Sequence, residues 1–333
     1  MAPRSGSHPF MYGCGEIPKE VSENIRALRA WIEKQPALPN LTDEHLYMFL
    51  HSNYNDLQKT QTTVGTYFAV RSATPEMFIK RSPVDPDIQS VLDMLYLVPL
   101  PKTTPEGYRV LMYKLRDTEP SKFNHANIAK TMILFSDICT AEHGICPGYI
   151  IIGDPRGFSA SHLTKINLGV LRIFMKYMQE AKPVRMKGIH IVHSAKIMEK
   201  LVAVARPFMK TELTKILHIH SGSDLTNLYK SVPRDILPEE YGGKEESLEV
   251  LHGKVGKPIS PAENAGGRRR GGEVDRRNGG VDASGKGPFG ERNGAVERAS
   301  LEKTGTIAIN RESAISAYFF PGISPPGNRL FIC

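Results

Sequence analysis

The chain has 333 residues, of which 40% are apolar, with a formal net charge of +8 and a pI near 9.2. This size can bury a core in one large or two smaller domains, and the positive charge favours acidic partners such as an anionic membrane. No uncharged apolar run of ~20 residues occurs, which argues against a transmembrane helix. The first residues lack the apolar stretch of a secretory signal, so we expect a cytoplasmic protein. The cysteines, which lack metal-like spacing and predict no disulfide framework, are Cys14, Cys139, Cys146 and Cys333.

Residues 18–82 predict an all-helical N-terminal lobe, preceded by a flexible start over 1–17. Apolar residues recur at helical spacing in Val21–Gln35, a pattern that ends before Pro36. Thr42 has the position of an N-cap for a second helix, and Asp56–Arg71 shows a third helical pattern.

Residues 83–252 predict an α/β domain with a mostly parallel sheet. Because the expected strands are separated by helices of crossover length, most of them should run in the same direction. Helical patterns cover 88–95, 124–142 and 161–181, and strand patterns cover 108–115, 148–153, 188–193 and 217–221.

The predicted helix Ala195–Met209 carries more apolar surface than one buried face requires. Its apolar residues spread well beyond a single stripe on a helical wheel. Two interpretations remain: the helix is buried on most sides, or it meets an apolar partner such as a lipid that is not always present. Its polar residues are Lys196, Glu199, Lys200 and Arg206.

Residues 253–333 differ from the rest and predict a disordered Gly/Arg-rich tail. They hold 15 of the 29 glycines and a net charge of +5, which leaves only +3 for residues 1–252. Segments such as Gly266–Gly272 cannot bury enough apolar surface to offset the chain entropy lost on folding. An interaction protein that acts through this basic tail is therefore one alternative hypothesis.

The common catalytic motifs are absent: the sequence has no phosphate-binding glycine loop and no nucleophile elbow. His218 and His220 alternate on one predicted strand and share a face, but a third metal ligand with suitable spacing is missing. His190 and His193 are expected on opposite faces of a regular strand. Asp154 follows a strand at a position where α/β sites often lie. A metal-dependent enzyme using Asp154, His218 and His220 is the second alternative; structural roles are favoured, and no catalytic residue, metal or cofactor is predicted.

Two groups of basic residues flank the apolar helix. One precedes the strand that leads into it, and the other follows it. They favour contact with an anionic membrane, where each basic residue near the surface adds about 1 kcal/mol. Nucleic acid is not expected as a partner, because aromatic residues do not interleave with the charges. The basic residues are Lys182, Arg185, Lys187, Arg206, Lys210 and Lys215.

Landmark segments occur in a fixed order over residues 18–245. The helical lobe contains Leu28-Arg-Ala-Trp-Ile-Glu-Lys-Gln-Pro-Ala-Leu-Pro39 and Tyr47-Met-Phe-Leu50. The later landmarks are Gly148-Tyr-Ile-Ile-Ile-Gly-Asp154, Lys187-Gly-Ile-His-Ile-Val-His193, Arg206-Pro-Phe208, Leu217-His-Ile-His-Ser-Gly222 and Leu237-Pro-Glu-Glu-Tyr-Gly-Gly243. Together they resemble the CRAL-TRIO (Sec14-like) lipid-transfer family, in the branch of α-tocopherol transfer and cellular retinaldehyde-binding proteins.

The resemblance implies that the helix Ala195–Met209 is a mobile gate over an apolar cavity, floored by the sheet and walled by helices. It implies a non-enzymatic carrier that moves a hydrophobic small molecule or lipid (tocopherol, retinoid or phosphoinositide class) between membranes, associating with them transiently. By position, the cavity residues implied are Phe135, Ser136, Ile152, Phe174, Tyr177, Met178, Val184, Ile189, Ile191, Leu201 and Val202. The gate residues implied are Ile197, Met198, Val204, Ala205 and Phe208.

Some members of this family bind phosphoinositide head groups through basic residues around the gate, and Arg185 and Lys187 fall on such positions. The expected membrane-facing set also includes Arg206, Lys210 and Lys215. The chain departs from the pattern at Glu212 and Ile216, where some relatives have a basic pair. Relatives usually continue past the Tyr-Gly-Gly landmark into a packed C-terminal segment, whereas residues 253–333 form a Gly/Arg-rich stretch without that pattern.

Overall fold

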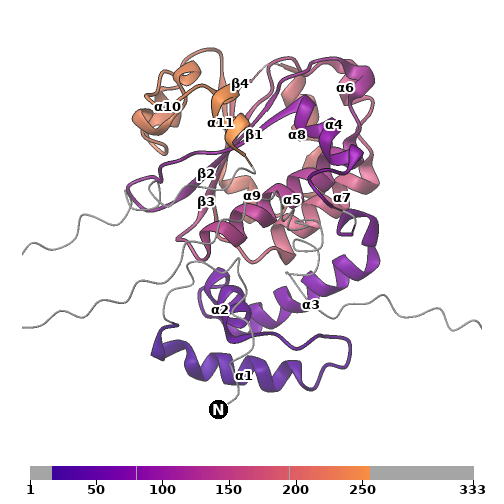
Figure 1. The fold of residues 1–333 in the computed structure, drawn as a ribbon, viewed down its shortest axis with the longest axis vertical. Coiled ribbons are helices and arrows are strands. Elements are labelled where there is room, and N and C mark those ends of the chain that lie inside the picture. The colour runs from indigo at the N-terminus through magenta and orange to yellow at the C-terminus, as the bar shows by residue number, and fades with distance from the viewer. Residues whose placement is uncertain (1–16, 80, 195, 256–333) are drawn as a thin grey trace, which may run out of the picture. The chain divides into compact units, whose positions relative to one another are not determined.

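The computed structural model describes residues 17–79, 81–194 and 196–255 (Figure 1). The described residues all belong to one compact unit. The predicted flexible start and nearly all of the predicted tail lie outside the described residues, so those two remain predictions. One boundary shifts, because helix α11 (Leu248–Lys254) continues beyond the predicted domain end at residue 252.

Three helices, α1 (Ser22–Ile32), α2 (Asp43–Ser52) and α3 (Leu57–Ala73), form the predicted N-terminal lobe. Thr42 caps α2 as expected, because its side chain accepts a hydrogen bond from the His45 amide. The apolar faces of the three helices pack together in the first core cluster. Short 3-10 turns precede and follow them: η1 (Lys19–Val21) and η2 (Pro75–Met77).

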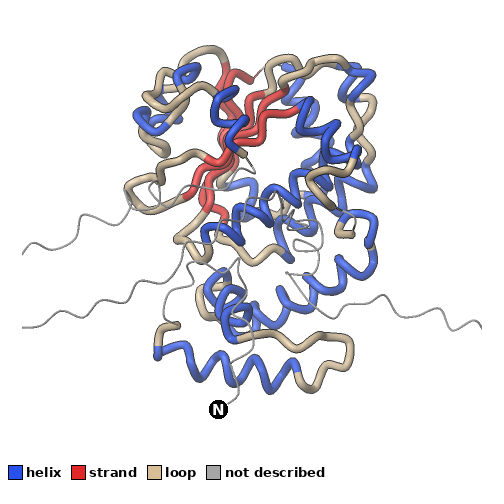
Figure 2. The backbone as a smooth tube through the Cα atoms, viewed as in Figure 1, coloured by secondary structure: helices blue, strands red, loops and turns tan. Residues whose placement is uncertain are grey.

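A five-stranded sheet of order β1-β2-β3-β4-β5 follows (Figure 2). Strands β2 to β5 are parallel, as predicted, and β1 is an antiparallel edge strand. The edge strand β1 was not predicted, because its five residues follow directly on α4 without a turn. The strands are β1 (Leu95–Pro99), β2 (Arg109–Leu115), β3 (Tyr149–Asp154), β4 (Met186–Ser194) and β5 (Leu217–Ser221).

The sheet has two differently covered faces. Val110, Ile150 and Val192 point to the side of α10 (Thr226–Tyr229) and α11 and form the second core cluster; we call this the α11 face. Leu111 and Ile151 point to the opposite side, where the third cluster packs against α4 (Pro86–Met94) and α5 (His125–His143); we call this the α5 face. The 3-10 turns η6 (Arg234–Ile236) and η7 (Glu239–Tyr241) complete the α11 side, and η3 (Pro120–Lys122) precedes α5.

The single helix predicted over 161–181 is interrupted. It consists of α6 (Ala160–Leu163), α7 (Leu168–Lys176) and a π-helical turn, η4 (Tyr177–Ala181). The Asn167 side chain accepts a hydrogen bond from the Val170 amide at 3.1 Å, so Asn167 starts a new helix rather than continuing the old one. The chain then passes through β4 into α8 (Lys196–Ala205), η5 (Arg206–Phe208) and α9 (Thr211–Lys215).

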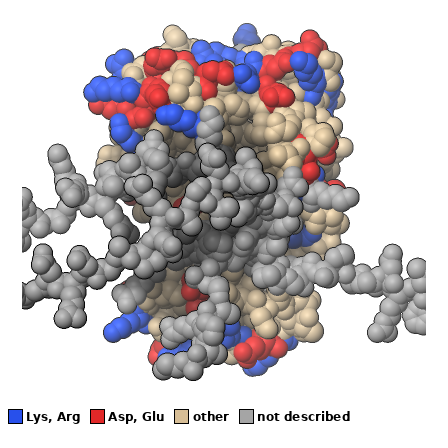
Figure 3. Space-filling view, in the orientation of Figure 1, with Lys and Arg blue, Asp and Glu red and all other residues tan. Residues whose placement is uncertain are grey.

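A buried charge cluster joins the N-terminal lobe to α5. Asp137 of α5 pairs with Lys182 at 2.8 Å, with Arg81 at 3.0 Å and more distantly with Arg71 of α3 at 3.9 Å. Burial alone would raise the pKa of Asp137, but Lys182, Arg81 and Arg71 outweigh it and hold the pKa at about 2. On the exposed surface, acidic and basic side chains are interspersed (Figure 3). Within the described residues, no helix combines the length and hydropathy needed to span a membrane.

Candidate functional site

Strand β4 presents an incompletely covered apolar strip on the α5 face. The register pairs Ile189 with Leu217 and Ile191 with Ile219, so these four side chains share one face of β4 and β5. Ile189, Ile191 and Leu217 are only half-buried, and Ile219 is 42% exposed. Val192, on the α11 face, is fully buried. One face of β4 is therefore fully packed at Val192, and the other is only partly covered.

Helix α8 lies on the same side of the sheet as α4, α5 and α7 (Figure 1). Met198 is its one buried residue, although most of the helix is apolar. The other predicted apolar positions of this segment are half-buried, and none belongs to the three core clusters formed by the described residues. These positions are Ile197, Leu201, Val202, Val204, Ala205 and, in η5, Phe208. The apolar side of α8 is therefore not pressed into one of these filled cores.

The backbone is strained at the end of β4, shortly before α8. His193, at the end of β4, has a φ of 49°, a left-handed conformation that a non-glycine residue rarely adopts. Its Nδ1 lies 3.1 Å from the Gly222 carbonyl, and its ring lies 6.0 Å from that of Tyr241 on the α11 side. The expectation that His190 and His193 lie on opposite faces assumed a regular strand, and the backbone leaves regular strand geometry between Ile191 and Ser194.

The remaining predicted cavity residues are divided among the core clusters. Phe135 and Val184 belong to the third cluster on the α5 face, and Ser136 is buried on α5. Tyr177, Phe174 and Met178 instead pack against the first cluster, where the Tyr177 ring lies 4.9 Å from that of Phe78. The structure thus places Ile189, Ile191 and α8 on the same side of the sheet, and places the Tyr177 group at the junction with the N-terminal lobe.

Ile152 lies on the wrong side of the sheet for the predicted cavity. It pairs with His190 and is completely buried in the second cluster on the α11 face. Its neighbour Ile151 lies on the α5 face and is half-buried. The sequence missed this because every residue of Tyr149–Ile152 is apolar, so the pattern carries no alternation that would fix which side chains point to which face.

The two basic residues at the start of β4 converge on one aromatic ring. The Arg185 guanidinium lies 4.0 Å from the centre of the Tyr54 ring, and the Lys187 ammonium donates a hydrogen bond to Tyr54 Oη at 2.9 Å. Tyr54 comes from the α2–α3 loop, has a φ of 56° and is 64% exposed. Burial, followed by the charges of Arg185 and Lys187, lowers the pKa of nearby His51 to about 4. This corner of the surface is therefore strongly positive, and Tyr54 was not anticipated as part of it.

The three other predicted membrane-facing residues lie after α8. Arg206 is exposed in η5, and Lys215 is exposed at the end of α9. Lys210 forms an ion pair with Glu180 at 3.2 Å, so part of its charge is compensated.

The predicted histidine pair is part of a row of three. His218 and His220 share the α11 face as expected, and His190 joins them: its Nδ1 lies 3.0 Å from His220 Nε2, and its ring lies 4.9 Å from that of His218. Asp154 is engaged elsewhere, by Arg156 and by the Tyr241 hydroxyl at 2.7 Å. No group of histidine, cysteine and carboxylate side chains among the described residues is arranged to hold a metal ion. The geometry therefore gives the metal-enzyme hypothesis no support.

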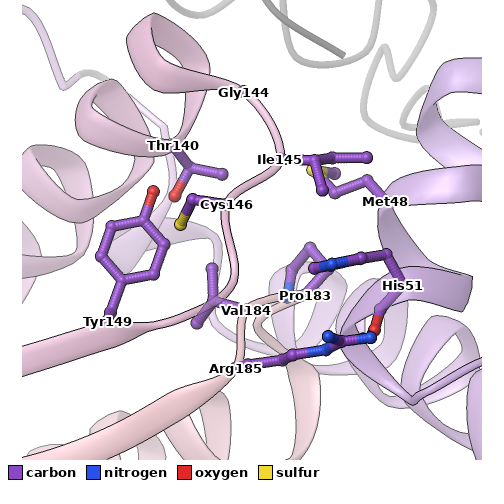
Figure 4. Close-up of a pocket in the computed structure, with 10 residues that line it drawn as sticks. All are labelled: Met48, His51, Thr140, Gly144, Ile145, Cys146, Tyr149, Pro183, Val184 and Arg185. Atoms are coloured by element: carbon purple, nitrogen blue, oxygen red, sulfur yellow. The ribbon is translucent and has the colours of Figure 1, made fainter. Parts of the chain in front are cut away.

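A small pocket lies between α2, the end of α5 and the start of β4 (Figure 4). It is lined by Met48, His51, Thr140, Gly144, Ile145, Cys146, Tyr149, Pro183, Val184 and Arg185. The buried Tyr149 hydroxyl has no hydrogen-bond partner within the described part of the chain. The pocket has room for about one water molecule, so it is too small for a lipid.

Comparison with protein-family models places two domains on the chain. Residues 93–243 match the CRAL/TRIO domain, and residues 17–88 match the Pinta-like, UBA domain. The two matches correspond to the sheet-containing part and to the helical N-terminal lobe.

Curated relatives align with about 70% of this chain. Alpha-tocopherol transfer protein-like from Mus musculus is 29% identical over 238 residues, covering 71% of this chain and 68% of that protein. Its Homo sapiens counterpart is 28% identical over 240 residues, covering 71% and 69%. Clavesin-2 from Rattus norvegicus is 24% identical over 231 residues, covering 68% and 70%. The crystal structure of Sfh5 aligns with a TM-score of 0.43 and 12% identity over 70% of this chain and 87% of that chain.

Proposed function

Because residues 93–243 match the CRAL/TRIO domain, we propose that this chain is a non-enzymatic carrier that binds one hydrophobic small molecule or lipid and transfers it between membranes. The relatives from Mus musculus and Homo sapiens are named alpha-tocopherol transfer protein-like, which supports a ligand of the tocopherol or retinoid kind. The proposal includes transient association of the carrier with the membrane surface.

The observation that carries this proposal is that the protein leaves two apolar surfaces on the same side of the sheet partly uncovered. Ile189 and Ile191 provide one surface on β4, and the half-buried side of α8, with Leu201 and Val202, provides the other. A ligand that buries about 300 Å² of apolar surface between them gains about 7 kcal/mol from the hydrophobic effect before the costs of binding. That is enough for reversible binding, which a carrier requires.

We define residues 196–215, comprising α8, η5 and α9, as the gate segment. In the proposed mechanism this segment closes the ligand away from water and swings aside at a membrane. Its apolar side then contacts lipid in place of the ligand, so opening exposes little apolar surface to water. The strained His193 lies just before the segment, where a change of backbone direction is needed.

The direct test is to purify the full chain and identify what it carries. Organic extraction followed by mass spectrometry should recover a lipophilic molecule at close to one per protein. Fluorescent tocopherol and retinoid analogues should compete with it. Protein that carries no lipophile and binds none of the tocopherol, retinoid or phosphoinositide probes would contradict the proposal.

We further propose that Arg185 and Lys187 contact anionic phosphate groups on the membrane, including those of phosphoinositides. The cations are held side by side against Tyr54 at an exposed corner. Since each basic residue near an anionic surface contributes about 1 kcal/mol, Lys187→Gln should weaken binding to vesicles containing phosphatidylinositol bisphosphate about fivefold. Lys244→Gln is the matched control, because Lys244 is an exposed lysine paired with Asp235. Equal binding by both variants would refute this assignment while leaving the carrier function intact.

A further inference from the structure

The Gln179 side chain bonds to the backbone of the gate segment from outside it. Gln179 donates from Nε2 to the Phe208 carbonyl at 2.9 Å, and its Oε1 accepts from the Lys210 amide at 2.7 Å. These two backbone groups flank Met209, which is extended with φ −94° and ψ 130°. The Gln179 amide therefore binds this stretch as a neighbouring strand would, with one donor and one acceptor.

The π-helical turn η4 places Gln179 in this position. The Lys182 amide donates to the Tyr177 carbonyl at 2.9 Å, an i to i+5 bond that widens the turn. Tyr177 and Ala181 are completely buried against the N-terminal lobe, while Gln179 lies between them in sequence and reaches the opposite way, to η5. One short turn thus connects the immobile core with the end of the gate segment.

Apart from Gln179, η5 is in contact with α7. Glu180 adds an ion pair with Lys210 at 3.2 Å, but both side chains are substantially exposed and such pairs contribute little. Phe208 and Met209 are half-buried and belong to none of the three clusters formed by the described residues. The two hydrogen bonds of Gln179 are therefore a main restraint on this end of the segment.

From this geometry we propose that Gln179 is a positioning residue that latches the gate segment shut, so that its release sets the rate of ligand exchange. The inference rests on the proposed carrier function. Opening breaks the bonds to Phe208 and Lys210, and water replaces both because Gln179 is only half-buried. The latch is therefore weak enough to open reversibly and strong enough to keep the closed state dominant.

The variant Gln179→Leu removes both bonds to the gate segment, and with them the bond from Gln179 Nε2 to the Met175 carbonyl within its own helix, while keeping the side chain similar in size. We expect backbone amides of residues 206–215, above all that of Lys210, to exchange hydrogen about tenfold faster in the ligand-free full chain. Exchange in α3 and in strands β2 to β4 should stay unchanged, as should the urea midpoint of unfolding. Transfer of a fluorescent tocopherol analogue between phosphatidylcholine vesicles should also be about tenfold faster.

Two controls separate the latch from other effects. Gln179→Glu keeps the acceptor for the Lys210 amide and should restore part of the protection, whereas Lys210→Ala removes only the ion pair and should change exchange little. Unchanged exchange at 206–215 in Gln179→Leu, or faster exchange spread over the whole chain, would overturn the latch. A third outcome is that Gln179→Leu shows the faster local exchange while the wild-type protein carries no lipophile. That result would count against the carrier function alone.

Discussion

Lys182 and Asp137 form an ion pair of 2.8 Å in which both side chains are almost completely buried. The pair lies where α5, the end of η4 and the N-terminal lobe meet, and Arg81 and Arg71 approach the same carboxylate. A carboxylate that serves three cations from separate segments is a structural requirement, because its loss leaves buried positive charge without compensation.

Asp137→Asn should therefore destabilise the protein by about 3–5 kcal/mol, the range for breaking a buried ion pair. The measurement is urea unfolding at neutral pH, followed by fluorescence of Trp31 in the N-terminal lobe. Asp87→Asn is the matched control, since Asp87 is exposed and its ion pair with Lys130 is long, at 3.9 Å. This substitution should change stability by less than about 0.5 kcal/mol. A loss for Asp137→Asn no larger than for the control would show that the cluster is not needed.

The two faces of the sheet should respond differently to substitution. Ile191→Trp places a larger side chain on the half-covered face, so we expect lipophile binding to weaken at least about tenfold with little change in stability. Ile152→Val, on the packed α11 face, should cost about 0.5–1.5 kcal/mol of stability and leave the dissociation constant unchanged. Titration with a fluorescent tocopherol or retinoid analogue and urea unfolding distinguish the two. The reverse pattern would place the ligand on the α11 face.

Acid should destabilise the protein through His190. Burial, followed by the neighbouring His218 and His220, lowers the pKa of His190 to about 4, against 6.5 for an exposed histidine. Because the folded state resists protonation, this stability is fully present above pH 6.5 and is lost as the pH falls toward 4. Between pH 7.5 and pH 5 the loss amounts to about 2 kcal/mol for this side chain.

His190→Gln cannot ionise, so its stability should fall less between pH 7.5 and pH 5 than that of the wild type, whatever its stability at pH 7.5. A residual slope is expected from His51, whose pKa burial also lowers to about 4. Identical pH slopes for the wild type and the variant in urea unfolding would refute this role for His190.

Features set by neighbouring residues could be predicted from the sequence. The cap at Thr42, the helices of the lobe and the four parallel strands all follow from local spacing and composition. The landmark segments also indicated the CRAL/TRIO domain that matches residues 93–243. The apolar character of Ala195–Met209 singled out α8 before its partial burial was known.

Features set by distant contacts could not be predicted in the same way. The cluster around Asp137 joins segments far apart in the sequence, although a lone aspartate in the apolar run of α5 was a signal that a partner exists. The π-helical turn η4 has no sequence pattern of its own, so the role of Gln179 stayed hidden. Ile152 was predicted on the wrong face of the sheet because a continuously apolar strand has no alternation of apolar and polar residues that would show which side chains share a face.

In strand β4, alternate residues serve two different purposes: stability of the fold and contact with the proposed ligand. Its even-numbered positions, His190 and Val192, maintain the fold, and its odd-numbered positions, Ile189 and Ile191, face the proposed ligand. Substitutions at the odd positions therefore escape most of the stability constraint that holds the even ones. In the proposed carrier, single substitutions at the odd-numbered positions can therefore change which ligand is bound. No compensating change in the core has to come first.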